Sequence, residues 1–571
     1  MKNLLTLTLL FFTLNILAQS TAISIDGKFE DWNNLTTYTD TSETLTGIDF
    51  LETQITNDNN YLYIHIKTNI DFSLQSTLIP QDIRLYIDTD NNEITGHPEQ
   101  SGFGSELGIV FQERFAYINN SSGDQVGFSN FGFRSAPTVT SNEFEIAIDR
   151  NSLIDGVNPL FTNNTIKLFW QNGHNNDRLP NTGTFISYTF DDTPITQYTP
   201  IDINKEQTNF IRVCAYNTLE NGIAESDRLP HFEKVIKAIN PDIIAFQEFG
   251  VDYTTIKNLM DNWLPLGTSH GWYVHFGIIS KWEITENWTN FTNENPADYR
   301  QYAALIKLPT EYGTDLLFVN SHLDYGIHNA ERQNEINGWN DFLVDAKTTG
   351  GNIDLPTNTP IVYLGDLNLV GYSQQLTSLL TGIDENGNGI SPDWDYSNFK
   401  SATALQTDIN MYYSWRSDTF SVGNFSPGKL DYILYTGSVL NEEKSFVLQT
   451  EEMPTYRLAL YNLDQNNTSS ASDHFPIVAD FSIISNLGVL DNNLNKFQIY
   501  PNPTNKILNI EIENTTFNNI ELFDIYGKLI QTFEVNDTAK TINIEHLNSG
   551  IYFIQISNNK GNKITKKLIK K

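Results

Sequence analysis

Apolar side chains occupy every second position in several short runs, as in residues 61–67, 83–87 and 144–148. Alternation with a period of two is typical of antiparallel strands that bury one face. Stretches rich in Asn, Asp, Thr and Gly separate these runs, and such residues favour turns. The pattern therefore predicts a β-sandwich over residues 22–195.

The pattern changes over residues 208–484. Apolar residues at positions 229, 232, 235, 236 and 239 have the spacing of one helical face, with Ser226 and Asp227 as candidate caps and Pro241 after the helix. Apolar runs at 243–246, 316–319, 361–364 and 432–435, and at 211–215 with Arg212 as an interruption, predict buried strands. This mixture of helix and strand patterns predicts an α/β domain with mixed sheets.

The two ends of the chain differ from these domains. Residues 1–20 predict a secretory signal: Lys2 is followed by an apolar segment from Leu4 to Leu14 and by small residues around Ala18. That segment is too short for a stable membrane span, and no later run is long enough, so we expect an exported, soluble mature protein. An Asn-rich linker over 485–496 leads to short strands at 507–512, 520–525 and 551–556, which predict a small all-β domain over 497–571.

Composition and charge narrow the possible functions. A chain of 571 residues predicts several domains, and a hydrophobic content of 39% is enough for packed cores. The formal net charge of -34 opposes general adhesion to nucleic acid or to anionic membranes. A phosphate-bearing substrate would therefore need a metal ion or a local cationic patch. Cys214 is the only cysteine, which excludes an intrachain disulfide, and we expect its thiol to be buried and unreactive.

Six polar motifs stand out in the α/β domain, because most of them close or lie inside a predicted strand. They are Tyr216-Asn217, Gln247-Glu248, Ser321-His322, Gly365-Asp366-Leu367-Asn368, Leu430-Asp431-Tyr432 and Ser472-Asp473-His474. Buried strands normally end in Val, Ile or Leu, so polar residues at one end of successive strands predict a polar site built on a sheet. Acids, amides and two histidines in one site indicate metal-assisted phosphate chemistry.

In their order and content, these motifs resemble the endonuclease/exonuclease/phosphatase superfamily, which includes DNase I, AP endonucleases, bacterial sphingomyelinases and inositol polyphosphate phosphatases. The resemblance spans the whole domain. It implies a four-layer α/β sandwich with the site at one edge of two packed sheets. It also implies a metal-dependent phosphoric ester hydrolase.

The resemblance and the donor chemistry together indicate how a metal would be held. Glu248 is a hard-oxygen ligand suited to Mg²⁺, which takes one or two carboxylates and keeps several waters. Asn217 would help to hold the metal and the phosphate, and Asp473 would lie in the inner or outer shell of the metal. The expected cofactor is Mg²⁺, with Mn²⁺ or Ca²⁺ as alternatives.

The expected catalytic residues are His322, Asp366, Asn368, Asp431 and His474. His474 can accept a proton near neutral pH, and Asp431 would hold its ring and favour the imidazolium form. By resemblance, Asp366 orients the water, Asn368 contacts the phosphate and His322 lies near the phosphoryl oxygen or the leaving group. AP endonucleases typically carry Tyr in place of His322, so within the superfamily the resemblance is greater to DNase I and the sphingomyelinases.

Other polar residues have an equally simple structural interpretation. Arg300, Arg332 and Arg416 could each clamp a phosphate or form a structural salt bridge. Arg332 lies in a polar stretch that leads into a helix, where members of the family that the motifs resemble often carry an Arg, so it is the candidate for substrate binding. Acidic turns at 88–92 and 384–388 lack the closing Glu of an EF-hand loop. The second is best explained as an Asx-rich turn, and a calcium site stays open for the first.

The outer domains carry resemblances of their own. Residues 25–32, the strands that follow and the 88–92 turn are similar to family 9 carbohydrate-binding modules, which implies a possible glycan ligand. Residues 500–503, the strand that begins at Gly550 and the basic C-terminal end resemble the sorting domain of the type IX secretion system of Bacteroidetes-like bacteria. That resemblance implies recognition by the type IX machinery and a secreted or cell-surface location, reached through the periplasm.

Three hypotheses for function follow. The first is a secreted metal-dependent phosphodiesterase, most simply a nuclease that acts on extracellular DNA or RNA. The second is a phospholipid or sugar phosphate esterase, which would need an apolar loop beside the site; Trp272, Tyr273 and Trp282 are candidates that core packing explains equally well. The third is a non-catalytic surface-binding protein, against which the intact set of polar motifs argues. Residues 359–370, 392–395 and 426–432 also resemble a group of secreted bacterial proteins, which leaves the substrate open.

Overall fold

The structure is a computed structural model that forms two compact units, Met1–Ile484 and Ser485–Lys571. It describes residues 22–40, 46–118, 124–154, 156–193, 198–289, 300–417, 421–484, 497–512, 519–525, 527–534, 539–557 and 563–571. The expected signal peptide over 1–20 and the expected linker over 485–496 lie outside these residues. No helix in the described ranges is long and apolar enough to cross a membrane.

The N-terminal part of the first unit consists of two main antiparallel sheets. One has the order β1-β2-β3-β11-β10 and the other β13-β12-β4-β7-β8-β9, with β14 beside β12. Their bounds are β1 Thr37–Thr39, β2 Phe50–Asn57, β3 Tyr61–Phe72, β4 Ile83–Asp88, β7 Leu107–Val110, β8 Phe115–Ile118, β9 Gln125–Gly127, β10 Arg134–Ala136, β11 Ser141–Asp149, β12 Thr165–Asn172, β13 Arg178–Leu179 and β14 Ile186–Thr189; β5 (His97–Gln100) and β6 (Phe103–Ser105) form a separate pair.

The alternating pattern explains how these sheets pack. Leu62, Ile64 and Ile66 of β3 enter one hydrophobic cluster with Leu85 and Ile87 of β4, because side chains two positions apart share a face. The predicted N-terminal β-sandwich is therefore confirmed as an all-β region. It also shares a second cluster with the α/β part, through residues such as Ile25 and Trp32.

The central part contains two six-stranded sheets, β17-β18-β16-β15-β26-β25 and β19-β20-β21-β22-β24-β23. The first contains β15 Ile211–Asn217, β16 Ile243–Gln247, β17 Tyr273–His275, β18 Ile278–Ser280, β25 Leu440–Val447 and β26 Ile477–Ile483. The second contains β19 Ile284–Thr289, β20 Gln301–Ile306, β21 Leu316–His322, β22 Ile361–Asp366, β23 Lys400–Ser401 and β24 Asp431–Tyr435. The helices are α1 Leu229–Ile239, α2 Tyr253–Trp263, α3 Asn329–Lys347, α4 Ser373–Thr381, α5 Thr455–Tyr461 and α6 Asn467–Ala471.

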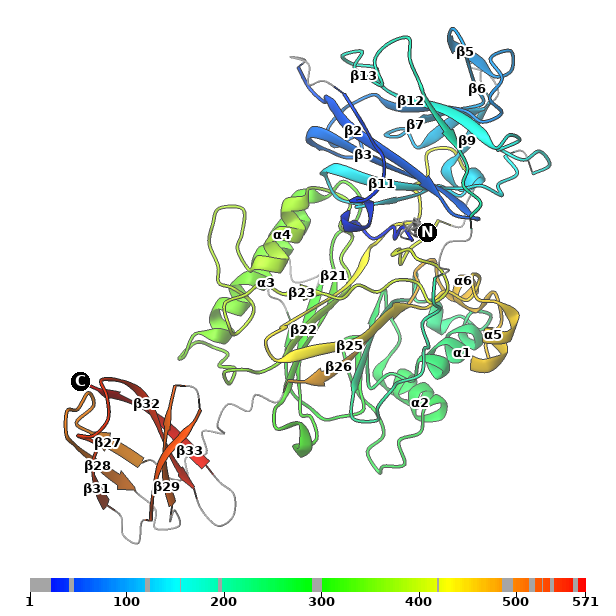
Figure 1. Cartoon of the computed structure of the whole chain (residues 1–571). Helices are drawn as coiled ribbons and strands as arrows, with labels where there is room; N and C mark the ends of the chain where they lie inside the picture. Colours follow the sequence, from blue (N-terminus) through cyan, green and yellow to red (C-terminus); the bar gives the residue numbers. More distant parts are fainter. Residues whose placement is uncertain are drawn as a thin grey trace, which may run out of the picture. The chain divides into compact units, whose positions relative to one another are not determined.

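These elements form four layers. Val213 and Ala215 of β15 point into a cluster between the two sheets, whereas Cys214 and Tyr216 point into a cluster with α1, α2, α5 and α6. Helices α3 and α4 cover the outer face of the other sheet, on the opposite side of the domain (Figure 1). The expected four-layer α/β sandwich is confirmed. Cys214 is buried as expected, and burial raises the pKa of its thiol far above the usual value.

Two differences from the sequence expectations concern helices. Arg228, not Ser226 or Asp227, stands at the start of α1, and its side chain makes no capping hydrogen bond. Helix α3 was not evident as a periodic pattern, because the residues that it buries include Arg332, Glu335 and Asn340. A helix that buries charged and amide side chains has no continuous apolar stripe.

The second unit is a small all-β domain, as predicted. Its sheets have the orders β27-β28-β31 and β30-β29-β32-β33. The strands are β27 Phe497–Tyr500, β28 Ile507–Ile512, β29 Asn519–Asp524, β30 Leu529–Glu534, β31 Ala539–Asn543, β32 Gly550–Ser557 and β33 Lys563–Lys570. Alternate side chains of β28, β29 and β32, such as Ile510, Ile520 and Ile554, build its core.

Candidate active site

The polar motifs of the central domain meet because neighbouring strands end at the same edge. Strands β15 and β16 are parallel, with Asn217 beside Gln247, and β21 and β22 are parallel, with His322 beside Asp366. Strand β24 runs antiparallel to β22 and begins at Asp431, directly opposite Asp366. Gly365 has φ +138°, and an added Cβ would lie 1.9 Å from the Ser321 carbonyl oxygen, so the approach of β22 to β21 at this edge requires glycine.

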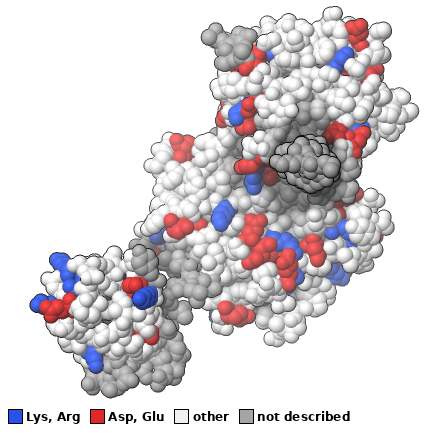
Figure 2. Space-filling model, in the orientation of Figure 1, with Lys and Arg blue, Asp and Glu red and all other residues white. Residues whose placement is uncertain are grey.

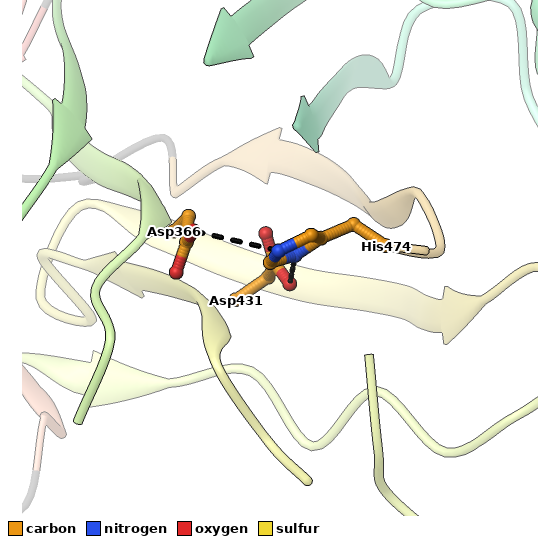
Figure 3. Close-up of side chains that lie close together, drawn as sticks. All are labelled: Asp366, Asp431 and His474. Atoms are coloured by element: carbon orange, nitrogen blue, oxygen red, sulfur yellow. Dashed lines mark hydrogen bonds and ion pairs between the residues drawn. The ribbon is translucent and has the colours of Figure 1, made fainter. Parts of the chain in front are cut away.

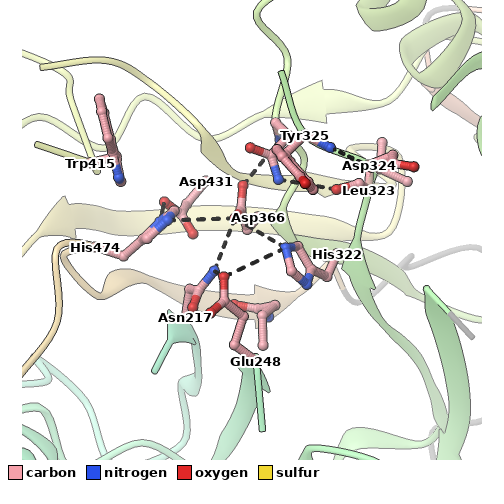
Figure 4. Close-up of polar contacts among 12 residues, drawn as sticks. Asn217, Glu248, His322, Leu323, Asp324, Tyr325, Asp366, Trp415, Asp431 and His474 are labelled. Carbon is pink, nitrogen blue, oxygen red and sulfur yellow. Dashed lines mark hydrogen bonds and ion pairs between the residues drawn. The ribbon is translucent and has the colours of Figure 1, made fainter. Parts of the chain in front are cut away.

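Asp366 lies at the centre of the polar cluster (Figure 4). Its Oδ2 accepts a hydrogen bond of 3.0 Å from the Asn217 amide and lies 3.5 Å from Nε2 of both His322 and His474. The carboxyl group is almost fully buried, which raises its pKa against the opposing effect of the nearby His474. One carboxyl oxygen therefore joins side chains from the ends of β15 and β21 and from the segment that precedes β26.

His474 and Asp431 form a buried pair (Figure 3). His474 Nδ1 lies 2.8 Å from Asp431 Oδ2, and the same oxygen accepts a 2.7 Å hydrogen bond from the Ser414 hydroxyl. Asp366, Asp431 and His474 each place one ligand atom within 4.8 Å of the others. The His474–Asp431 contact already uses two of these groups, so the geometry is that of an oriented imidazole.

The surroundings of His474 strongly favour its charged form. Burial alone would lower the pKa of the imidazole, but the carboxylates of Asp431 and Asp366 raise it to about 10. Its Nε2 is free of Asp431 and lies on the side of Asp366 and the cavity. At neutral pH the ring therefore carries a proton, and its role as a proton acceptor stays a prediction, which a nearby bound cation would favour by lowering this pKa.

Glu248 follows β16 in the left-handed region, with φ 52°. Its two oxygens accept hydrogen bonds from the Asn217 side chain at 3.1 Å and from the Glu220 amide at 2.6 Å. Burial would raise the pKa of Glu248, but these hydrogen bonds and the nearness of His322 and His474 lower it. The site thus holds Glu248 as a carboxylate on the cavity wall.

Asp473 supplies a second carboxylate to the same cavity. Its Oδ2 accepts a 2.9 Å hydrogen bond from the Trp415 indole, while its Oδ1 is buried without a hydrogen-bond partner. A buried carboxylate oxygen needs a proton donor or a cation. Asp473, Glu248 and the side-chain oxygen of Asn217 would offer only oxygen donors, the kind that a hard divalent cation such as Mg²⁺ prefers.

Asn368 lies at the base of the cavity, with φ 47°. Its amide nitrogen donates to Asp366 Oδ1 at 3.1 Å, and its side-chain nitrogen donates to the Leu323 carbonyl at 3.0 Å. These bonds connect the end of β22 to the loop after β21. Asn368 therefore fixes the position of Asp366 and also contributes to the cavity wall.

The structure does not place Arg332 at the cavity. Its side chain is fully buried in α3, where its guanidinium donates to the Asp324 and Gly326 carbonyls and to the Asn329 and Gln375 side chains. Arg332 thus holds the loop that follows His322, and it offers no exposed donor to a substrate. The expectation of direct substrate binding by Arg332 is not supported by this geometry.

Arg300 is the arginine that lines the cavity. It lies 3.6 Å from Asp324 and 3.7 Å from Glu335, so it is only loosely paired. Arg416, the third arginine in the sequence analysis, forms an ion pair of 2.9 Å with Glu451. The structure therefore favours Arg300 over Arg416 as a cationic group for a phosphate.

Two side chains of the site carried no signal in the sequence. Ser414 binds Asp431, and Trp415 binds Asp473, although both lie in an irregular loop far from these residues in the chain. No strand end or paired motif marks this loop. Only its position beside β24 and β26 brings it to the site.

The cavity that contains the cluster has a volume of about 470 Å³. Its polar lining includes the charged and amide groups of Glu248, Arg300, His322, Asp366, Asn368, Asp473 and His474, together with Ser73, Gln75, Ser76, Thr138 and Ser426. Apolar walls are contributed by Leu74, Pro137, Val370, Trp415, Phe425 and Leu430. A cavity of this size with a few converging polar groups is typical of a binding site for a small ligand.

A second acidic cluster lies in the N-terminal β-sandwich, where Asp88, Asp90 and Glu106 place ligand atoms within 4.8 Å of one another. Lys167 Nζ lies 3.3 Å from Asp88 and already offsets part of this charge. In the 384–388 turn, Asp384 accepts hydrogen bonds from the Asn386 and Asn388 amides at 2.8 and 2.7 Å. These are the contacts of the Asx-rich turn that the sequence predicted there.

Sequence comparison supports the assignment of two domains. Residues 214–474 match the Endonuclease/Exonuclease/phosphatase family, and residues 498–571 match the Secretion system C-terminal sorting domain. The chain therefore contains an endonuclease/exonuclease/phosphatase domain followed by a secretion sorting domain. The motifs of these two segments implied the same assignment. Neither match extends into the N-terminal β-sandwich. No curated protein matches the chain.

Several solved structures are similar to part of the chain. TDP2 from D. rerio, complexed with a single-strand DNA product, has 14% identity and TM-score 0.32, covering 48% of this chain and 99% of that one. The human Nocturnin catalytic domain with bound sulfate has 17% identity and TM-score 0.30, covering 49% and 95%. Sphingomyelinase C from Streptomyces griseocarneus has 16% identity and TM-score 0.30, covering 48% and 99%.

Proposed function

We propose that this protein is a secreted, divalent-metal-dependent phosphodiesterase, and that its principal substrate is nucleic acid. The observation that carries the proposal is the His474–Asp431 pair, whose free Nε2 lies beside Asp366 in a cavity that Glu248 and Asp473 also line. The family match and the sorting domain support a secreted phosphoric ester hydrolase. The preference for nucleic acid and the need for a metal belong to the proposal.

In the proposed mechanism, His474 Nε2 removes a proton from the attacking water as the water oxygen bonds to phosphorus; one P–O ester bond breaks, and the departing oxygen takes a proton from solvent. Asp431 holds the ring and stabilises the imidazolium. Asp366 accepts a hydrogen bond from that water and orients it. His322 and Asn368 donate hydrogen bonds to phosphoryl oxygens. Glu248, Asp473 and Asn217 would hold the divalent cation, which would neutralise charge on the phosphoryl oxygens and lower the pKa of the nearby His474.

A second cavity supports nucleic acid as the substrate. It has a volume of about 520 Å³ and shares Glu248, Arg300 and His322 with the first. Its walls include Tyr253 and Phe276, which are 42% and 38% exposed. Aromatic rings beside a phosphate site can stack with nucleobases.

Surface charge favours local recognition of the phosphate. On the face that Figure 2 shows, acidic and basic side chains are interspersed over the central domain, without a long basic stripe. A protein with a net charge of -34 does not gain affinity from many phosphate contacts. The proposed enzyme would therefore bind one or two nucleotides at the site.

A phospholipid esterase is the second candidate, and one loop favours it. Tyr325 and Ile327 follow His322 closely in sequence and are 63% and 82% exposed. Tyr325 also lines the cavity. Exposed apolar side chains beside an active site can dock on a lipid surface.

A substrate panel separates these candidates. Purified full-length protein is mixed with Mg²⁺, Mn²⁺ or Ca²⁺ and with single-stranded DNA, RNA, plasmid DNA, sphingomyelin vesicles or bis(4-nitrophenyl) phosphate. We expect the generic diester and the nucleic acids to be cleaved faster than sphingomyelin. Preferential cleavage of sphingomyelin would favour the second candidate, and no cleavage of any diester would contradict the proposed function.

Removal of residues 497–571 should leave catalysis intact and block release from the cell. The sorting domain forms its own compact unit, and the described residues that line the candidate site all belong to the first unit. A chain that ends before residue 485 should therefore retain the kcat/KM of the full chain and accumulate in the periplasm. The measurement is activity and immunoblotting of periplasmic and external fractions; normal release of the shortened chain would refute the role in sorting.

The N-terminal β-sandwich could also bind a ligand of its own. A glycan ligand for it is a prediction from the sequence alone. Whether the mature protein stays on the cell surface or is released is likewise left to the fractionation experiment.

A further inference from the structure

The N-terminal β-sandwich forms part of the catalytic cavity. Two of its segments, residues 73–76 and residues 137–138, line the same cavity as His322, Asp366 and His474. The first segment follows β3 directly, and the second follows β10. The candidate site is therefore enclosed by two parts of the chain that the sequence assigned to separate modules.

Hydrogen bonds hold the first segment against the catalytic domain. Gln75 Nε2 donates to Ser426 Oγ at 2.6 Å, and Gln75 Oε1 accepts from the Ser426 amide at 2.9 Å. Arg114 donates to the Gly423 carbonyl at 2.6 Å and lies 4.2 Å over the Phe425 ring. Because Phe425 and Ser426 also line the cavity, these contacts hold cavity-lining residues of the N-terminal segment and of the catalytic domain together.

The second segment is joined to the loop that follows Asn368. Thr138 Oγ1 donates to the Leu369 carbonyl at 2.8 Å, and the Thr140 amide donates to the Gly371 carbonyl at 2.9 Å. Ile25 also pairs with Met411 in a parallel bridge, at the start of the stretch that carries Ser414 and Trp415. The wall is thus attached to the segments that position the candidate catalytic groups.

From these contacts we infer that the N-terminal β-sandwich is the wall of a subsite for one compact arm of a phosphodiester. This inference rests on the proposed function and specifies its substrate. The wall combines apolar side chains, Leu74 and Pro137 with the neighbouring Phe425, with polar ones such as Gln75 and Thr138, and this mixture suits a nucleoside. A longer polymer would have to turn away from this wall to leave the cavity, so we expect the arm on this side to be the end of a strand or a small alcohol.

The second cavity takes the other arm. It meets the first at Glu248, Arg300 and His322, and the described residues that line it all lie between Phe246 and His322 of the central domain. Phe276 stacks on Tyr302 with ring centroids 4.8 Å apart and an angle of 6°, and forms a flat apolar surface there. The phosphorus would lie at the junction of the two cavities, with the compact arm on the walled side.

The test compares substrates that differ only in having an end. A single-stranded DNA oligonucleotide is supplied in linear form and as a ligated circle of the same sequence, beside thymidine 5′-(4-nitrophenyl) phosphate. We expect full-length protein with divalent metal to degrade the linear form at least roughly tenfold faster than the circle. If thymidine 5′-(4-nitrophenyl) phosphate is cleaved and neither oligonucleotide is cut, the walled subsite binds one ester group of a small diester and not the end of a strand.

A matched pair of variants tests the wall itself. Ser76 lines the cavity, whereas its neighbour Thr77 is exposed and lies outside it. Ser76→Trp should lower kcat/KM for thymidine 5′-(4-nitrophenyl) phosphate by roughly tenfold or more, and Thr77→Trp should leave it within about twofold of wild type. Melting temperatures verify that both variants fold.

Each outcome has a definite meaning. Equal cleavage of the circular and the linear oligonucleotide by wild-type protein would overturn the walled subsite, whether or not Ser76→Trp folds. An unchanged kcat/KM in folded Ser76→Trp would overturn it as well. In both cases the proposed phosphodiesterase function survives, because the diester is still hydrolysed. Absence of any hydrolysis by wild-type protein with Mg²⁺, Mn²⁺ or Ca²⁺ overturns the proposed function, and this inference with it.

Discussion

Stripping divalent cations from the purified protein is expected to abolish phosphodiester hydrolysis, and returning one suitable ion should restore it. The cavity is lined by the carboxyl groups of Glu248, Asp366 and Asp473, and Asp431 lies directly behind His474. A phosphate is anionic, so it would meet unfavourable charge in this cavity without a bound cation. Full turnover in excess EDTA after metal stripping would rule out the metal mechanism.

Glu248→Gln should reproduce part of this loss through weaker metal binding. The amide keeps the shape of the side chain but removes the charge that its hydrogen bonds and neighbouring histidines stabilise. A direct readout is the rise in melting temperature on addition of Mg²⁺, since a ligand at a hundred times its Kd adds about 2.7 kcal/mol of stability. This rise should shrink in Glu248→Gln and persist in Glu311→Gln, a control at an exposed position. An equal rise in both variants would show that Glu248 does not hold the ion.

Asp431→Asn and His474→Ala are expected to lower turnover by similar factors, roughly a hundredfold or more, because a positioned acid-base group contributes on that scale. Asp431 binds only one nitrogen of the ring, and the other nitrogen performs the proposed proton transfer. Without the carboxylate, the ring loses both its orientation and the charge that stabilises the imidazolium.

The double variant distinguishes a catalytic unit from two independent contributions. Residues that act as one unit show strongly non-additive losses, so the double variant should be little slower than either single variant. Both side chains are buried, at 0% and 5% exposure for Asp431 and His474, and the variants should also lose about 1–3 kcal/mol of stability. Turnover is therefore measured well below the melting temperature of each variant, with circular dichroism as the folding check. Additive losses would contradict the paired role.

Much of the fold follows from local patterns. Predicted strands such as 211–215 and 361–364 lie within β15 and β22, and the predicted small domain at the C-terminal end is present. Continuous apolar runs identify buried strands because both faces of each sheet are covered. Helix α3 escaped the same reasoning because it buries Arg332 and Glu335, whose partners come from the loop after β21.

The sequence indicated the polar residues at the strand ends of the candidate site, but not the segments that surround them. Asn217, His322 and Asp366 each close a strand, and this departure from apolar strand ends is visible in the sequence. Ser414 and the wall around Gln75 are brought to the site only by packing between distant segments. Arg332 matched a family position, yet only the coordinates place its guanidinium among backbone carbonyls instead of at the cavity. Long-range contacts of this kind leave no periodic signal in one sequence.

The most direct test of the proposed active site is the rate at which folded His474→Ala hydrolyses bis(4-nitrophenyl) phosphate with saturating divalent metal, relative to wild type. His474 joins the buried Asp431 to the cavity that Glu248 and Asp366 also line. We predict clear turnover by the wild-type protein and a fall of roughly a hundredfold or more in the variant. Near-wild-type turnover by well-folded His474→Ala would contradict the proposal that this cluster is the catalytic site.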